Sequence, residues 1–426
     1  MSPRAASACS AGPDAVVITG VGVLTAAGEG LDALSGAVRA NACCGAPWQS
    51  ALPVSLVATV PTDVQEDGEF PDDRKAWLAH RALDGALLTA GVSGPRPFGD
   101  RRVSVYLGTG LSSVTGDELE RDLFPHIHDD GAGGRAFDRA SMGRDLAPDH
   151  AAPRRHMPAR VTASFARRLQ ATAPSSTNFS ACAAAAQAMA EGLWTLRRGL
   201  ADVAVVGGHD SMAHPMGLLS FVVLGALSPD RCRPFDRRRD GFMLGEGAAI
   251  FVLERLADAV ARGASVYGVL AGAGTSVDAW NVTAPHPEGA GAELAMRRAL
   301  ADARIGAAEV GYVNAHGTGT PVGDVAEATA VSRVFGDVPI SSIKGVVGHT
   351  IAAAGAVEAA ACLAGLLEGY LPGTAGLDEP DPACPVRALT APVSREVGFM
   401  ASNSFGFGGQ NASLIFAHPD VEVIRV

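Results

Sequence analysis

Short apolar runs rich in valine and isoleucine recur along the chain, and each has the length and composition of a buried β-strand. The clearest are VVITGVGVL from residue 16, RVSVYLGTG from 102, VAVVGG from 203, AAIFVLERL from 248 and SLIFA from 413. Alanine-rich segments that favour helix alternate with these runs. Strands without a polar side, alternating with helices, indicate a sheet that helices cover on both faces. We therefore expect an α/β fold.

Three pairs of similar segments indicate an internal duplication. Each pair shares an order of strand, small-residue turn and second element: 106–117 with 312–324, 175–192 with 341–360, and 241–254 with 398–416. We therefore predict two related halves, 14–265 and 266–418. The second pair places Cys182 and His349 at corresponding turns, so we expect their side chains to face each other across a pseudo-twofold axis.

The first half is longer than the second, and most of the surplus lies in the polar stretch 118–165. Loops of this length usually carry function. We interpret this stretch as an insertion over the surface or over the mouth of the active site.

The net charge of −11 over 426 residues argues against nucleic acid as the main partner, because phosphate binding needs a basic surface. The seven cysteines are scattered and form no CxxC pair, so neither a disulfide framework nor a structural zinc site is expected. We find no signal peptide and no apolar run long enough to span a membrane. These features predict a cytoplasmic protein with no membrane association.

Cys182 is the first candidate for chemistry, because it follows the polar, strand-like segment 175–180 and precedes an alanine-rich helix. At a helix N-terminus, the helix dipole and free N–H groups favour a thiolate, the nucleophilic form of cysteine. The small residues after Cys182 leave room for a bulky acyl group. The alternative is that Cys182 is a small buried hydrophobe, as most free cysteines are.

Two histidines are the next candidates. His316 ends a strand and enters the run HGTGT, whose glycines allow close approach of a ligand and whose Thr318 and Thr320 offer hydroxyl donors. His349 begins an alanine-rich helix, whose positive end disfavours a charged imidazolium. Lys344, five residues upstream, adds positive charge with the same effect. We therefore expect a neutral His349 that donates a hydrogen bond.

Together these segments resemble the β-ketoacyl-acyl carrier protein synthases of the type I/II elongating class, which are condensing enzymes of the thiolase superfamily. The resemblance covers nearly the whole chain, through ACAAA around Cys182, RPFDRRRDGFMLGEGA from 233, NAHGTGTPVGD from 314, SSIKGVVGHTIAAAGAVEA from 341 and NSFGFGGQN from 403. It implies the thiolase fold, a five-layered αβαβα arrangement of two similar halves. The alanines after Cys182 and the Gln410 in the last motif depart from the family pattern and leave substrate and pathway open.

The resemblance also implies roles for the reacting groups. Cys182 is similar to the acyl-accepting nucleophile, and His316 and His349 to the pair that supports decarboxylation and enolate formation. Lys344 resembles the family's lysine five residues before the second histidine, and Glu358 the glutamate nine residues after that histidine.

Three further residues match positions that contact the substrate in the family. Thr318 and Thr320 resemble the threonines that contact the phosphopantetheine arm of a carrier protein. Phe405 resembles the gating phenylalanine, whose backbone N–H forms the oxyanion hole together with that of Cys182.

The implied activity is decarboxylative Claisen condensation of a Cys182-bound acyl chain with malonyl-acyl carrier protein, in fatty acid or in type II polyketide or polyene biosynthesis. No metal or redox cofactor is expected, and the implied partners are an acyl carrier protein and a second chain in a homodimer or a ketosynthase-like heterodimer. A thiolase is disfavoured, because no second cysteine occupies a comparable glycine-rich turn. The remaining alternative is a chain-length-determining or priming decarboxylase subunit, which the retention of Cys182 and both histidines argues against.

An acidic carrier protein needs a basic patch near the entrance to the site. The arginine-rich stretches offer five candidates on charge alone: Arg154, Arg155, Arg160, Arg237 and Arg238.

Overall fold

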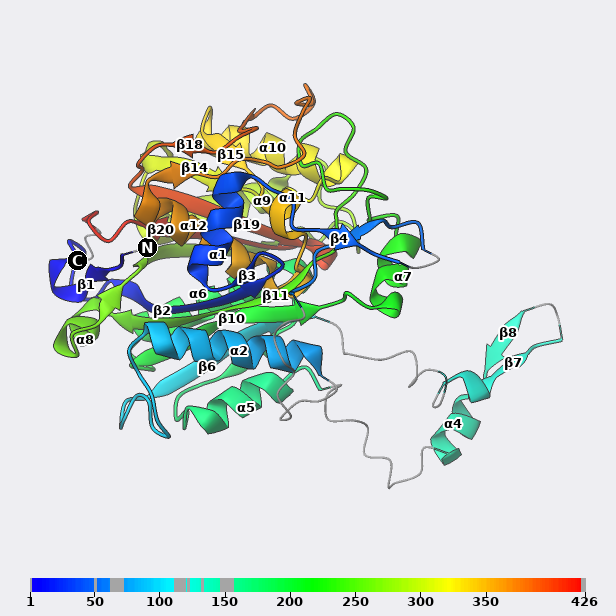
Figure 1. The fold of residues 1–426 in the computed structure, drawn as a ribbon, viewed down its shortest axis with the longest axis horizontal. Helices are drawn as coiled ribbons and strands as arrows, with labels where there is room; N and C mark the ends of the chain where they lie inside the picture. Colours follow the sequence, from blue (N-terminus) through cyan, green and yellow to red (C-terminus); the bar gives the residue numbers. More distant parts are fainter. Residues whose placement is uncertain are drawn as a thin grey trace.

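The computed structural model describes residues 2–49, 52–61, 73–110, 120, 123–131, 134–145 and 157–422. At its centre is a mixed sheet formed by two sets of strands (Figure 1). The first set has the order β9 (Ser176–Asn178), β6 (Val103–Thr109), β10 (Val203–Ser211), β11 (Glu246–Arg255) and β2 (Val16–Thr25). The strands β9, β6 and β10 are parallel, whereas β11 and β2 pair antiparallel with their neighbours.

The second set of strands repeats this order. It consists of β15 (Pro339–Ser341), β14 (Val310–Asn314), β19 (Phe399–Gly406), β20 (Gln410–Ala417) and β13 (Gly268–Val277), with β17 (Arg387–Ala388) beyond β15. Again three strands are parallel and the last two are antiparallel. The sets join where Gly268 faces Ile18 and Val269 faces Val17. The topology is thus duplicated, while the residue limits of the two halves stay a prediction.

Helices cover both sets of strands and also separate them. On one outer face, α2 (Arg74–Thr89) packs on β2 and β11, and α5 (Arg160–Arg168) packs on β6. On the other outer face, α9 (Ala290–Ala303) packs on β13 and β20, and α10 (Pro321–Phe335) packs on α9. Between the sets lie α6 (Ala184–Arg197) and α12 (Ala354–Glu368), which contact strands of both (Figure 1). This is the predicted five-layered thiolase fold.

Small residues explain why two helices fit between the two sets of strands. A Cβ atom added to Gly355 of α12 would lie 2.8 Å from the Cβ of Ala186 in α6, so the two helices cross in close contact. The stretch Ile351–Glu368 is the one helix in the described chain that is long and apolar enough to cross a membrane, but 89% of it is buried inside the protein. The high hydropathy of this helix therefore reflects its position in the central layer of the protein.

The remaining elements border this core. They are α1 (Leu31–Ala40), α7 (Pro215–Val223), α8 (Leu256–Ala261), α11 (Lys344–Val347), β1 (Arg4–Ala5), β3 (Gly28–Glu29), β4 (Ala46–Pro47), β5 (Leu56–Val57), β12 (Ser265–Val266), β16 (Tyr370–Leu371) and β18 (Val393–Ser394).

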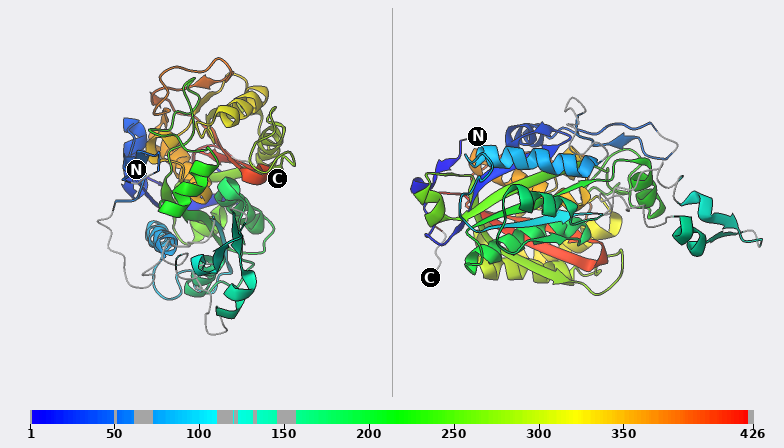
Figure 2. Two further views of the ribbon diagram at one scale, coloured as in Figure 1. Left: turned by 90° about the vertical axis from the view of Figure 1, so that its right-hand side faces the viewer. Right: turned by 90° about the horizontal axis from the view of Figure 1, so that it is seen from below.

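The predicted insertion 118–165 divides into two parts in the structure. The strands β7 (Ile127–Asp129) and β8 (Arg135–Phe137), with α4 (Arg139–Asp145), form a small unit that stands away from the body (Figure 2). In contrast, α5 belongs to the outer layer and buries Val161 and Phe165. The predicted end of the insertion is therefore wrong, because the many arginines of this segment concealed the apolar i, i+4 pair of a packed helix.

Candidate active site

Cys182 lies at a turn from strand to helix, as predicted. It occupies the short 3₁₀ turn Ala181–Ala183, which follows β9 and leads into α6, and its side chain is buried. Ala181 has a left-handed backbone with φ of 48°, a conformation that is strained for a residue with a Cβ atom. The strained residue turns the chain sharply and presents Cys182 at the start of the helix.

The structural counterpart of Cys182 in the second half is Ala352, not His349 as the sequence repeat predicted. The 3₁₀ turn Ile351–Ala353 precedes α12 and also begins with a left-handed residue, since φ of Ile351 is 50°. His349 lies three residues before Ala352 and forms a parallel bridge with Leu244. The sequence repeat was aligned in the wrong register. The shape of each turn is fixed by one residue with positive φ, which is Ala181 in the first half and Ile351 in the second. Neither alanine nor isoleucine is typical of that conformation, so the residue types did not reveal the correspondence.

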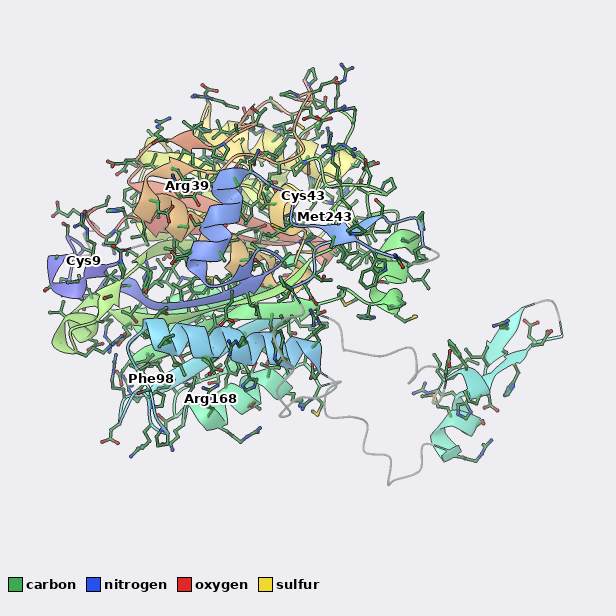
Figure 3. The ribbon with its side chains drawn as sticks, viewed as in Figure 1. Cys9, Arg39, Cys43, Phe98, Arg168 and Met243 are labelled. Carbon is green, nitrogen blue, oxygen red and sulfur yellow. The ribbon has the colours of Figure 1, made fainter. Side chains whose placement is uncertain are left out.

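The structure brings Cys182, His316 and His349 together. The Nε2 atom of His349 lies 3.1 Å from the Cys182 Sγ, and the rings of His316 and His349 meet edge to face with centroids 5.4 Å apart. The backbone N–H of His349 donates to the carbonyl of Met243 at 2.8 Å, and the Met243 side chain, labelled in Figure 3, lies against Cys43. All three catalytic candidates are buried.

The protonation state of Cys182 differs from the prediction. Burial raises the pKa of the thiol to about 12; the charge of Lys344 lowers it, and those of Asp210 and Glu358 raise it further. The thiol is therefore neutral near pH 7 in this state of the protein. The prediction of a thiolate at this helix N-terminus is wrong, because the loss of hydration raises the pKa by more than the helix dipole lowers it.

Both histidines are neutral, as we expected for His349, and burial is a cause that we did not predict. Burial holds the pKa of each imidazole well below its usual value, and the charge of Lys344 lowers both further. His349 follows the end of α11 and precedes the turn before α12, so it does not itself start a helix.

Lys344 and Glu358 form a buried ion pair behind the histidines. The Lys344 ammonium donates to the Glu358 carboxylate and also to the backbone carbonyl of His316 at 2.5 Å. Burial raises the pKa of Glu358 to about 7, although the charge of Lys344 opposes that shift. The pair therefore fixes the backbone of His316 through its carbonyl group.

A second buried carboxylate at the site, Glu327, was not predicted. It accepts the backbone N–H groups of His316 and Gly317 at 2.8 and 2.7 Å, and burial raises its pKa to about 7. Asp324, three residues earlier on α10, accepts the N–H of Gly319 at 3.1 Å. The signal was present in the sequence, because two acidic residues spaced by three follow the HGTGT run.

A cavity of about 310 Å³ opens in front of the three side chains. Apolar side chains of Phe221, Phe242 and Ile351 line one part of it, whereas Thr318 and Thr320 line another. The Phe405 ring also borders the cavity, with its centroid 5.9 Å from that of His316. The structure thus places Thr318, Thr320 and Phe405 at the site, as the sequence predicted.

Gly406 lies directly against the start of the nucleophile helix. A Cβ atom at this position would lie 3.1 Å from the Cys182 nitrogen and 2.9 Å from the Ser180 carbonyl oxygen. The absence of a side chain keeps the surroundings of the Cys182 N–H open. Nothing in the sequence distinguishes this glycine from the others in its motif, so its role was not predicted.

The predicted basic patch is weaker than its sequence indicated. Arg160 pairs with Asp73 at 2.9 Å, Arg238 with Asp236 at 3.1 Å, and Arg237 with Glu379 at 3.7 Å. Carboxylates therefore offset each of these charges. Arg154 and Arg155 lie outside the described residues.

Comparisons with known proteins identify the family of the chain. Residues 13–259 match the family "Beta-ketoacyl synthase, N-terminal domain", and residues 267–378 match "Beta-ketoacyl synthase, C-terminal domain". Nodulation protein E of Rhizobium meliloti is 45% identical over 242 residues, which cover 56% of this chain and 60% of that protein. The 3-oxoacyl-[acyl-carrier-protein] synthase 2 of Staphylococcus aureus is 37% identical over 270 residues, which cover 61% of this chain and 67% of that protein.

A solved structure, the ishigamide ketosynthase/chain length factor, matches with a TM-score of 0.81 and 31% identity. That match covers 95% of this chain and 99% of the other. The family matches include the Cys182 turn, both histidines and the motif around Lys344. The chain therefore belongs to the β-ketoacyl synthase family.

Proposed function

We propose that this protein is a β-ketoacyl-acyl carrier protein synthase. In the proposed reaction, Cys182 accepts an acyl group from a carrier-protein thioester, and a malonyl thioester then extends it by two carbons with loss of CO2. The observation that carries this proposal is the contact between the Cys182 Sγ and the His349 Nε2 at 3.1 Å, with His316 beside it in one buried cavity.

The first stage is transfer of the acyl group. Because the thiol is neutral at rest, its proton passes to the His349 Nε2 as sulfur attacks the thioester carbonyl, and the proton then leaves with the carrier thiol. The N–H groups of Cys182 and Phe405 stabilise the tetrahedral oxyanion, and the space that Gly406 leaves open supports this role for Cys182.

The second stage is the condensation. Neutral His316 and His349 donate hydrogen bonds to the thioester oxygen of the malonyl group, which stabilises the enolate that forms when CO2 leaves. The enolate carbon attacks the Cys182 thioester, the carbon–carbon bond forms, and the Cys182 sulfur leaves as a thiolate. This thiolate takes a proton from solvent, which restores the neutral thiol. Neither Nδ1 atom has a hydrogen-bond partner among the described residues, so both tautomers are open to His349 and it can serve in both stages.

Lys344, Glu358 and Glu327 act through His316. They hold its backbone at the carbonyl and at the N–H, so the ring keeps its position against His349. Thr318 and Thr320 border the cavity, where the phosphopantetheine arm would lie, and Phe405 gates it. No metal or redox group takes part in the proposed reaction.

The proposed partners are an acyl carrier protein and a second ketosynthase-like chain, in a homodimer or a heterodimer, in the cytoplasm. The name of the Staphylococcus relative supports the carrier protein, and the ishigamide protein, a ketosynthase with a chain length factor, supports a paired subunit. The pathway is fatty acid or specialised polyketide or polyene synthesis, and we favour the latter because of the insertion and the alanines after Cys182.

Intact-protein mass spectrometry tests the proposal. The protein is mixed with a panel of acyl carrier thioesters and then with malonyl carrier protein. We expect an acyl adduct that is lost in Cys182→Ala and that discharges into a product two carbons longer. Cys362→Ala is the matched control, because Cys362 is buried in the other central helix and should leave loading unchanged.

Two results would redirect the assignment. Decarboxylation of malonyl carrier protein without any acyl adduct would favour a priming decarboxylase. Neither adduct nor decarboxylation, with or without a candidate partner chain, would favour a chain-length subunit.

A further inference from the structure

The three side chains at the site also have the composition and spacing of a metal-binding site. The Cys182 Sγ and one ring nitrogen from each of His316 and His349 all lie within 4.8 Å of one another. A tetrahedral zinc site with bond lengths of about 2.3 Å to sulfur and about 2.0 Å to nitrogen separates such ligands by roughly 3.5 Å. The observed 3.1 Å between the Cys182 Sγ and the His349 Nε2 is close to that separation.

The charges around the three ligands suit a divalent cation. Each imidazole offers one ring nitrogen to the space that the three side chains share, and the thiol offers its sulfur. The buried carboxylate of Glu327 accepts the His316 N–H, and that of Glu358 is paired with Lys344. The buried ammonium of Lys344 is therefore matched by a carboxylate.

One coordination position would stay open. Three protein ligands facing a cavity of about 310 Å³ leave space for water as the fourth ligand. Metal-bound histidines usually donate their other ring nitrogen to a partner, which raises affinity. Neither Nδ1 has such a partner in the part of the chain that the structure describes, so binding should be reversible.

We propose that Cys182, His316 and His349 form a tridentate site for a borderline or soft divalent cation such as Zn²⁺, and that the bound cation blocks acylation. The Cys182 thiol loses its proton to solvent when the sulfur–metal bond forms, and no oxidation occurs. Inhibition rests on the proposed function, whereas the binding does not.

Cobalt provides a spectroscopic test that needs no turnover. Titration of the reduced protein with Co²⁺ should give one thiolate-to-cobalt charge-transfer band per chain, and Zn²⁺ should abolish it. Cys182→Ser should remove the band, and His316→Ala and His349→Ala should each weaken binding by about 10-fold or more. Cys362→Ala, a buried cysteine outside the site, should leave the titration unchanged.

The same samples separate the two proposals. A protein that loads acyl groups but shows no Cys182-dependent cobalt band would overturn the metal site and leave the condensing function intact. A protein that binds cobalt through Cys182 but never acquires an acyl group would retain the metal site and refute the proposed function. Loading that proceeds at full rate with Zn²⁺ bound would refute the inhibition.

Discussion

The starts of the two central helices have the same backbone conformation but differ in the groups that face them. Before α6 and before α12, a left-handed residue opens a 3₁₀ turn, and the second residue of the turn is Cys182 or Ala352. The Ala352 N–H donates to the carboxylate of Asp210 at 3.2 Å, and Asp210 pairs with buried Lys75 at 2.7 Å. At the Cys182 N–H, the facing strand presents Gly406 and no side chain.

In the proposed function, this difference gives a duplicated fold one reaction centre. Asp210 and Gly406 lie near the ends of β10 and β19, which occupy equivalent places in the two sets of strands. In one half, the carboxylate of Asp210 accepts the N–H of Ala352, so this turn has a structural role. In the other half, a glycine leaves space beside the N–H, where the proposed reaction places the oxygen of a substrate. In the proposed reaction, catalysis depends on an N–H group that faces a glycine instead of a carboxylate.

The largest expected effect comes from removing the carboxylate at the structural turn. Asp210→Ala removes a buried acceptor and the negative charge that neutralises Lys75, so it should lower the free energy of unfolding by about 3–5 kcal/mol. Chemical denaturation measures this change. Arg96→Ala is the control, because Arg96 forms an exposed pair with Asp100 and should change stability by less than about 1 kcal/mol. Equal small effects would show that Asp210 does not stabilise its turn.

A smaller effect is expected from filling the open space at the catalytic turn. Gly406→Ala places a methyl group beside the Cys182 N–H and should slow acyl loading roughly 100- to 1,000-fold, as the loss of an oxyanion donor does. Its φ of −113° is open to alanine, so the effect comes from the close contacts of the methyl group, which would lie 2.9 Å from the Ser180 carbonyl oxygen and must displace the turn slightly. Gly36→Ala, where a Cβ meets nothing within 4 Å, should load at the normal rate. Normal loading by Gly406→Ala would remove the Cys182 N–H from the oxyanion hole.

The smallest effect concerns the ionisation of Cys182 at one turn, which the charge of Asp210 at the other turn influences. Because the pKa of Cys182 is raised to about 12, its thiolate fraction should keep rising about tenfold per pH unit from about pH 8 to about pH 11. The rate of Cys182 alkylation by iodoacetamide, read by mass spectrometry, should follow it. The charge of Asp210 raises this pKa, so Asp210→Asn should speed alkylation at each pH below the plateau. A plateau near pH 9 in the unmodified protein would contradict the raised pKa.

Local patterns in the sequence were sufficient to predict several features. The apolar strands, the alanine-rich helices and the repeated segments indicated the α/β layers, and the comparisons confirm the family that the motifs around Cys182, His316 and His349 resembled. The turn from strand to helix at Cys182 was also correct. These features depend on neighbours within a few residues, which periodicity and small-residue turns encode directly.

Other features were settled only when distant segments met. The structural correspondence between Cys182 and Ala352 depends on the backbone angles of Ala181 and Ile351, which these residue types do not favour. Asp210 reaches Ala352 across 142 positions of sequence, which no local pattern records. Burial then reversed the expected ionisation of Cys182, because loss of hydration is a property of the packed site as a whole. The sequence by itself indicated the residues that we propose for the chemistry, and the tertiary structure decided their protonation and the groups that face each turn.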